Sequence, residues 1–267
     1  MTIPLGLCLG SFATAMIARI PAGRSWIASS SKAERSACLH CGHTLSVVDL
    51  VPLFSWLLLR GKCRHCSHAI GWRYPVTECA TLLLCLAVYG AWGFSVAGIV
   101  LMLAVPFIMA MMVIDLEYLI LPDQLQVIMF ALGIIFIFFQ SETPLSLDYT
   151  LEIYAYAFGA AAVYFLLAYG LEKGGMFLLK REALGMGDVK FFSVAGLWLG
   201  FTALPAFLLL AGAGGVLLGV IWQFVVKQKR FPFGPALLMA FLLLLLARGP
   251  LFSPIVGSFL SGFPGLS

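Results

Sequence analysis

The chain has 267 residues, of which 62% are hydrophobic and only 10% are charged, and its mean hydropathy is +1.03. Soluble globular proteins carry roughly 25% charged residues, so this composition excludes a soluble globular protein and predicts one that crosses a membrane several times. The net charge of +4 is small, and we expect no nucleic-acid partner.

Long apolar runs follow one another along the chain, and lipid can accommodate them as helices, whose backbone groups bond to one another. The sequence therefore predicts an all-α polytopic membrane protein of about eight transmembrane helices. The first run is followed by its basic residues, Arg19 and Arg24, instead of being preceded by them, so we interpret it as a retained span and not a cleaved signal. The predicted spans are residues 3–20, 76–92, 95–114, 124–140, 152–171, 188–202, 204–226 and 235–254.

The basic residues gather on one side of this predicted topology. With the N-terminus outside, the connections on the other side are residues 21–75, 115–123, 172–187 and 227–234. These segments and their immediate flanks hold every Lys and Arg of the chain except Arg248. The positive-inside rule predicts that this side is cytoplasmic.

Residues 21–75 form a polar insertion between the first helix (1–20) and a helical bundle (76–267). About 55 residues make a poor hydrophobic core, so a stabilising cross-link is expected. The insertion contains two similar C-x-x-C-x-H motifs, at residues 38–43 and 63–68. Two such pairs about twenty residues apart are typical of a tetrahedral four-cysteine zinc site. The predicted ligands are Cys38, Cys41, Cys63 and Cys66.

Three alternatives to this zinc site remain open. Disulfides are disfavoured by the cytoplasmic placement, and a redox pair does not need two matched motifs. In the third alternative, a histidine inside a motif, His40 or His65, replaces one cysteine as a zinc ligand.

Two aspartates fall at span ends on the predicted cytoplasmic side. Asp115 ends the third predicted span, and Asp188 begins the sixth. A carboxylate at the bilayer centre costs roughly 2.5–3.5 kcal/mol on insertion scales, whereas at a boundary water reaches it. A single interfacial acid is more often a helix cap or an ion-pair partner, and Glu117 and Asp123 compete with Asp115 in the same loop. As a pair, however, the two aspartates predict a shared site.

Two neighbouring carboxyl groups can hydrolyse a peptide if one is ionised and activates water while the other is protonated and donates to the carbonyl oxygen. Asp188 lies at a predicted helix N-terminus, where the helix dipole favours an anion, and Lys190 is close in sequence. Asp115 lies at a predicted helix C-terminus, where the dipole disfavours one. The sequence therefore predicts Asp188 as the general base and Asp115 as its protonated partner.

In order along the chain, these motifs resemble the bacterial type IV prepilin leader peptidases, which also act as N-methyltransferases. The resemblance covers most of the chain and is more specific than an isolated GxGD motif. It rests on Gly10-Ser11-Phe12, Arg19-Ile20-Pro21, the paired C-x-x-C motifs, Arg73-Tyr74-Pro75, Glu78, Ile114-Asp115, Leu121-Pro122-Asp123, Gly185-Met186-Gly187-Asp188-Val189-Lys190 and Phe233-Gly234-Pro235. The chain departs from the family at Thr14, where Asn is frequent, and at His40, where Pro is frequent.

The resemblance implies that Asp115 and Asp188 are the catalytic pair, with Asp123, Gly185, Gly187 and Lys190 in supporting positions. The implied substrate is a prepilin or pseudopilin whose short basic leader ends in Gly, cut at the cytoplasmic face of the bacterial inner membrane. This would serve a type IV pilus or type II secretion.

Methylation of the new N-terminus implies S-adenosylmethionine, at or near the insertion. Gly61 and Glu78 are the candidate cofactor residues.

Two other functions compete with this interpretation. One is an intramembrane aspartyl protease that cuts within a transmembrane helix, and the other is a zinc-stapled, non-enzymatic scaffold of a pilus or secretion machine. Acids at the membrane edge and a zinc-binding insertion disfavour the first, and a cleavage assay separates the second. The glycine-rich run from Gly212 to Gly219 is interpreted as a surface for close helix packing.

Overall fold

The computed structural model describes residues 2–26, 36–38, 40–140, 147–180, 184–227 and 231–250. These residues are mostly helical, and their β-structure consists of two isolated bridges, Ala37–Thr44 and Lys62–Ala69. The predicted all-α class is confirmed. The helices are α1 (Thr2–Arg19), η1 (Val48–Leu50), α2 (Phe54–Leu58), α3 (Arg73–Trp92), α4 (Val96–Tyr118), α5 (Asp123–Gln140), α6 (Leu147–Leu179), α7 (Met186–Leu199), η2 (Phe201–Ala203), α8 (Leu204–Val225) and α9 (Gly234–Ala247).

Six of the described helices are long and apolar enough to cross a membrane, namely α1, α3, α4, α5, α6 and α8. Two further predicted spans correspond to α7 and α9, which have 14 residues each in the described part of the chain. Such helices are about 21 Å long, short of a hydrocarbon core of about 30 Å. Gly200 ends α7 with a φ of +66°, a conformation that suits glycine, inside the apolar run predicted to continue to residue 202. Residues 251–254 of the last predicted span lie outside the described residues.

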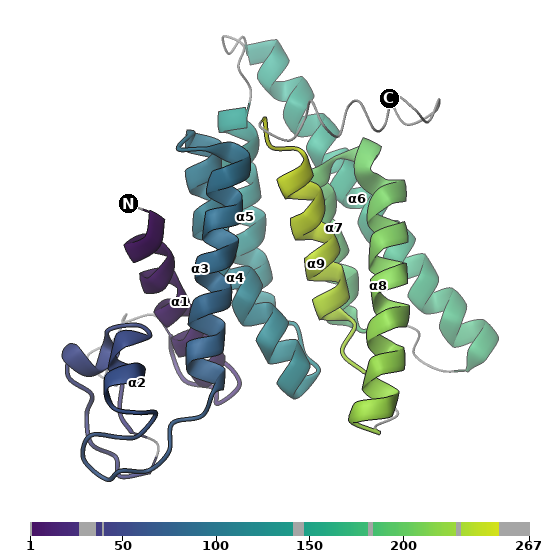
Figure 1. The fold of residues 1–267 in the computed structure, drawn as a ribbon. Helices are drawn as coiled ribbons and strands as arrows, with labels where there is room; N and C mark the ends of the chain where they lie inside the picture. Colours follow the sequence, from purple (N-terminus) through teal and green to yellow (C-terminus); the bar gives the residue numbers. More distant parts are fainter. Residues whose placement is uncertain are drawn as a thin grey trace.

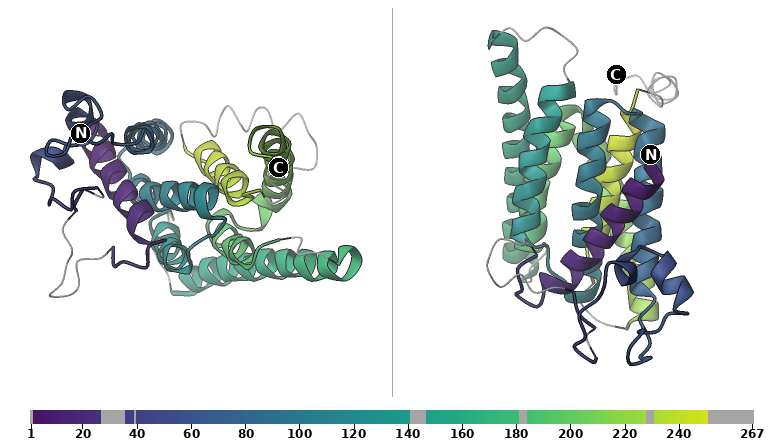
Figure 2. Two further views of the ribbon diagram at one scale, coloured as in Figure 1. Left: turned by 90° about the horizontal axis from the view of Figure 1, so that it is seen from below. Right: turned by 90° about the vertical axis from the view of Figure 1, so that its left-hand side faces the viewer.

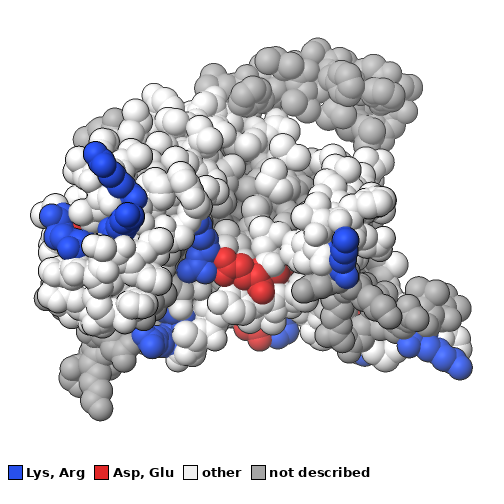
Figure 3. Space-filling view, turned by 60° about the horizontal axis from the view of Figure 1, so that its bottom comes forward, with Lys and Arg blue, Asp and Glu red and all other residues white. Residues whose placement is uncertain are grey.

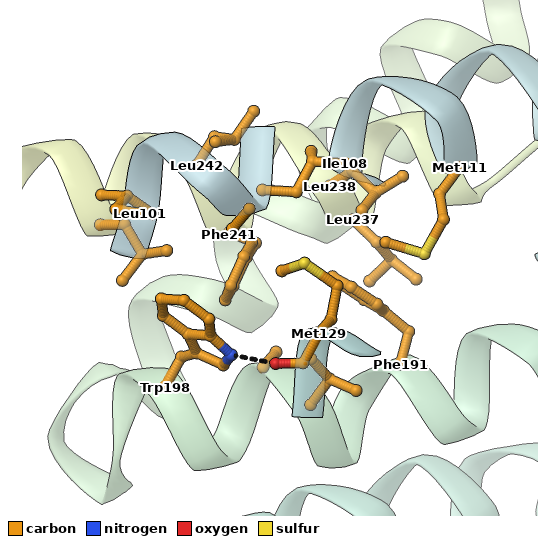
Figure 4. Packing of buried hydrophobic residues seen from close by; sticks show 14 of the residues in the cluster. Leu101, Ile108, Met111, Met129, Phe191, Trp198, Leu237, Leu238, Phe241 and Leu242 are labelled. Carbon is orange, nitrogen blue, oxygen red and sulfur yellow. Dashed lines mark hydrogen bonds between the residues drawn. The ribbon is translucent and has the colours of Figure 1, made fainter. Parts of the chain in front are cut away.

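The central part of the bundle consists of α4, α5, α7 and α9 (Figures 1 and 2). On one flank α1 packs against α3 and α4, on another α8 packs against α9, and the long α6 runs along α7. Figure 4 shows the buried residues at this centre, where Phe241 of α9 and Phe191 of α7 approach α4 and α5. The indole N–H of Trp198 donates to the backbone oxygen of Met129, 2.9 Å away, which ties α7 to α5.

Small residues set the separation of the flanking helices. A Cβ added to Gly10 of α1 would lie 2.9 Å from the Cα of Glu78 in α3, so α1 lies close against the backbone of α3. On α8, Gly219 faces the ring of Phe231, and Gly215 is in tight contact with the ring of Phe233. Within the glycine-rich run, Gly214, Gly215 and Gly219 thus lie against α9 and the segment just before it, which places the start of α9.

The insertion lies at the same end of the molecule as the end of α4 and the starts of α7 and α9 (Figure 1, lower end). Figure 3 brings this end forward and shows Lys and Arg side chains spread around it, with acidic side chains near its middle. This arrangement places the two aspartate-bearing segments and the insertion together, as the predicted topology required.

Candidate active site

Asp115 lies in the last turn of α4 and is buried, with 5% of its surface exposed. Its Oδ2 accepts a hydrogen bond of 2.9 Å from the backbone N–H of Gly234, the first residue of α9. The helix ends three residues later because Leu119 adopts a left-handed conformation (φ +57°) and its N–H caps the carbonyl of Asp115. Asp115 is therefore held from both its backbone and its side chain.

Gly234 leaves no space for a side chain at this contact. A Cβ at position 234 would lie 2.6 Å from Oδ2 of Asp115, which is closer than real Cβ atoms come to a neighbour. The sequence assigned Gly234 no contact with Asp115, although Gly followed by Pro235 at the start of an apolar run marks a helix start. Gly234 is a site residue that the sequence analysis missed.

Asp188 is the third residue of α7, and two glycines bring it to the site. Gly185 is the N-cap, and a Cβ there would lie 3.2 Å from Oδ2 of Asp188. A Cβ at Gly187 would lie 3.0 Å from the Cβ of Leu121, so the start of α7 lies against the loop that follows α4. Asp188 therefore begins α7 beside the loop that follows Asp115. The structure thus brings together the two segments that carry the predicted aspartates.

The structure places both aspartates at a helix N-terminus. Asp188 lies at the N-terminus of α7, as expected, but Asp115 faces the N-terminus of α9, which the sequence did not anticipate. A backbone N–H at a helix N-terminus stabilises an anion, so the Gly234 contact favours the ionised form of Asp115. The prediction of Asp115 as the protonated partner considered α4 alone, and the contact with α9 favours the ionised form instead.

Charged residues near the pair form ion pairs with each other. Lys190 Nζ lies 2.7 Å from Oδ2 of Asp123, so the lysine joins the start of α7 to the start of α5 and does not pair with Asp188. Arg73 at the start of α3 lies 2.7 Å from Oε2 of Glu117. The two acids that competed with Asp115 are thus both engaged in ion pairs, which favours Asp115 as the partner of Asp188.

The four predicted zinc ligands form one cluster, in which all sulfur atoms lie within 4.8 Å of one another. The Sγ atoms of Cys38 and Cys66 are 3.9 Å apart, and a tetrahedral site with Zn–S bonds of about 2.3 Å requires about 3.8 Å. The cysteines are free thiols, so the disulfide alternative is not supported. The donor set and spacing fit a zinc ion.

The two cysteine motifs fold in the same way. The N–H of Cys38 bonds to the carbonyl of His43, and the N–H of Cys63 bonds to the carbonyl of His68. Backbone hydrogen bonds to Cys41 and His40 lower the pKa of the Cys38 thiol to about 6, which favours the thiolate that binds metal. The four histidines lie in pairs outside the sulfur cluster, with His40 stacked on His68 and the ring of His43 tilted against that of His65.

Comparison with known proteins identifies two family domains along the chain. Residues 5–92 match the bacterial peptidase A24 N-terminal domain, and residues 102–222 match the type IV leader peptidase family. A prepilin leader peptidase/N-methyltransferase of Pectobacterium carotovorum is 34% identical over 252 residues, 86% of each chain. The chain belongs to the type IV leader peptidase family. It is an aspartic-type peptidase with methyltransferase activity.

Other relatives of this peptidase support the same family. The protein of the same description from Burkholderia pseudomallei is 34% identical over 88% of this chain and 81% of its own length. The one from Myxococcus xanthus is 36% identical over 81% of this chain and 61% of its own. No solved structure was found to match.

A second region of the peptidase, away from the aspartates, is a cavity of about 1500 Å³ between the insertion and α1 and α3. Glu78 of α3 lines it and accepts a hydrogen bond of 2.8 Å from the N–H of Leu53, so it also anchors the insertion to the bundle. Gly61 does not line the cavity. It forms a turn with φ +68°, and a Cβ there would lie 2.8 Å from the ring of Trp56.

Proposed function

We propose that this peptidase removes the short basic leader of type IV prepilins or pseudopilins after a Gly residue and then methylates the new N-terminus. The single observation that supports the cleavage step most strongly is that the end of α4, with Asp115, and the start of α7, with Asp188, lie together at one end of the bundle beside the N-terminus of α9. The names of the relatives supply the substrate class.

The cleavage step uses one carboxyl in each protonation state. Ionised Asp115 takes a proton from a water molecule as the water oxygen bonds to the scissile carbonyl carbon, and protonated Asp188 donates its proton to the carbonyl oxygen. As the C–N bond breaks, Asp115 gives its proton to the departing amine nitrogen. One hydroxyl of the intermediate returns a proton to Asp188, so both groups regain their starting states. The hydrogen bond from Gly234 supports Asp115 as the base.

The position of the pair suits a substrate with an apolar helix and a basic leader. The aspartates lie at the end of the bundle that holds the insertion and most of the described basic residues, which we assign to the cytoplasmic face of the bacterial inner membrane. A substrate can then keep its apolar helix in lipid while its leader lies in water. A protease that cuts within a membrane helix would need acids farther from such an end.

The methyltransferase step is assigned to the cavity between the insertion, α1 and α3. Its volume of about 1500 Å³ exceeds that of typical small-molecule sites, about 300–1000 Å³. When bound there, S-adenosylmethionine would supply a methyl group on a sulfonium cation, and Glu78 would provide a carboxylate to hold that cation. Ser11, Thr14 and Tyr74 line the same cavity and offer hydroxyl groups to the rest of the cofactor. Gly61 positions Trp56, another lining residue, and stays a candidate on that ground.

A two-step assay with the purified protein in detergent tests the proposal. Wild type should convert a prepilin to a product that mass spectrometry maps to cleavage after the leader Gly, and should methylate it when S-adenosylmethionine is added. Asp188→Asn should abolish cleavage. Asp148→Asn, in the first turn of α6, should leave cleavage unchanged. Equal processing by wild type and Asp188→Asn would favour the scaffold, and a cut inside the apolar helix would favour an intramembrane protease.

A further inference from the structure

Gln126 joins the two segments that carry the aspartates. It lies in the first turn of α5, with 4% of its surface exposed. Its side-chain Nε2 donates to the backbone oxygen of Leu121 at 3.2 Å and to that of Gly187 at 3.1 Å. Leu121 belongs to the loop that follows α4, and Gly187 directly precedes Asp188. One buried amide therefore holds both backbones.

The amide is suited to this place by its two donors. A primary amide has two N–H groups, and here each has a carbonyl acceptor. The same side chain's Oε1 is buried without a hydrogen-bond partner. Both donors of the amide are therefore in use, and a residue without them would lose two hydrogen bonds.

The junction that Gln126 closes is tightly packed. A Cβ at Gly187 would lie 3.0 Å from the Cβ of Leu121, and Leu121 itself is buried, with 7% of its surface exposed. A movement of the loop relative to α7 thus changes the position of Asp188 relative to Asp115. Asp115 itself is held independently by Gly234.

We infer that Gln126 is a positioning residue for peptide cleavage, which sets the place of Asp188 relative to Asp115 through its two hydrogen bonds to Leu121 and Gly187. This inference rests on the proposed roles of the aspartates. Two carboxyl groups act on one water and one carbonyl, so a displacement of about 1 Å at the junction reduces turnover by roughly 10²-fold. Substrate binding does not require a buried side chain to move, so KM should change little.

The test compares Gln126→Met with Gln124→Met. Met has the length of Gln and no donors, so it keeps the volume and removes both bonds. Gln124 is an exposed neighbour on the same helix turn, whose Oε1 accepts a bond from Trp26, and it provides the matched control. We expect Gln126→Met to lower kcat for cleavage by roughly 10- to 100-fold with KM within about threefold of wild type. Gln124→Met should leave both constants near their wild-type values.

Two further measurements separate positioning from a structural role. Methyl transfer to a peptide that has already been cleaved should be unchanged in Gln126→Met, because the cavity lies away from α5 and α7. Gln126→Glu keeps the shape and turns an acceptor toward the two carbonyls, so its kcat should fall at least as far as that of Gln126→Met.

A wild-type kcat in Gln126→Met would overturn the inference. So would a parallel loss of cleavage and methyl transfer, with a changed KM, in Gln126→Met and Gln126→Glu. If Asp188→Asn loses cleavage while Gln126→Met cleaves as fast as wild type, this inference is rejected and the proposed function stands.

Discussion

The backbone N–H of Gly234 donates a 2.9 Å hydrogen bond to the Asp115 carboxylate, although the two residues are 119 positions apart. The contact connects the last turn of α4 to the first residue of α9. It places the positive N-terminal end of α9 against Asp115. From hydropathy alone, Asp115 lies only at the negative C-terminal end of α4. This tertiary contact therefore favours the ionised form of Asp115.

Gly234→Ala should reduce cleavage by roughly 10²-fold in kcat, because its Cβ would lie 2.6 Å from Oδ2 of Asp115 and must displace that carboxylate. The control is Gly212→Ala on α8, where an added Cβ meets nothing within 4 Å. Steady-state kinetics on a prepilin substrate measure both. Wild-type turnover by Gly234→Ala would show that the contact does not position Asp115.

Zinc should be lost from Cys66→Ser and retained by Cys79→Ser, because Cys66 belongs to the four-sulfur cluster and Cys79 lies outside it on α3. Metal analysis of freshly purified, reduced protein checks this. Zinc loss should impair methyl transfer more than cleavage, since the insertion forms one wall of the cavity and carries neither aspartate. Protein that lacks zinc as purified would contradict the four-cysteine site.

Glu78→Gln should lower methyl transfer at least about tenfold, which corresponds to about 1.4 kcal/mol in the barrier, while cleavage stays near the wild-type rate. Gln keeps an oxygen to accept the bond from Leu53, so the insertion remains anchored and only the charge is removed. Glu152→Gln, an exposed glutamate of α6, is the matched control. Equal loss of both activities would assign Glu78 a purely structural role.

Asp49 should stabilise the insertion by a constant amount across neutral and mildly acidic pH. The hydroxyl of Ser46, then the guanidinium of Arg64, lower the pKa of Asp49 from 3.8 to about 2. Since the folded pKa is depressed, this contribution is complete above pH 3.8 and is lost as the pH falls toward 2.

The difference in Tm between wild type and Asp49→Asn should therefore be flat from about pH 5 to about pH 8. A difference that shrinks within this range would contradict the depressed pKa.

The topology of the site was predictable from local signals. Apolar runs and basic connections placed Asp115 and Asp188 on one side, and the paired C-x-x-C motifs placed four thiols together. The first prediction follows from hydropathy and the distribution of basic residues, and the second follows from the spacing of the cysteines.

Residue contacts across the bundle were not predictable in this way. Gly234 bonds to Asp115 and Gln126 bonds to Gly187, and both partners are far away in the chain. A glycine before a proline, or a polar residue in a first helical turn, is already explained by local helix-start preferences. Hydropathy also gave α7 too long an extent, because apolar residues continue past Gly200, where the backbone turns.

The most direct test of the account is the cleavage rate of Asp115→Asn, Asp188→Asn and the double variant, measured on one prepilin substrate. The account predicts that each single change lowers kcat by roughly 10³-fold or more, and that the double variant is hardly slower than either, because the two carboxyl groups act as a unit. Near-wild-type cleavage by either single variant, or losses that multiply in the double variant, would contradict it.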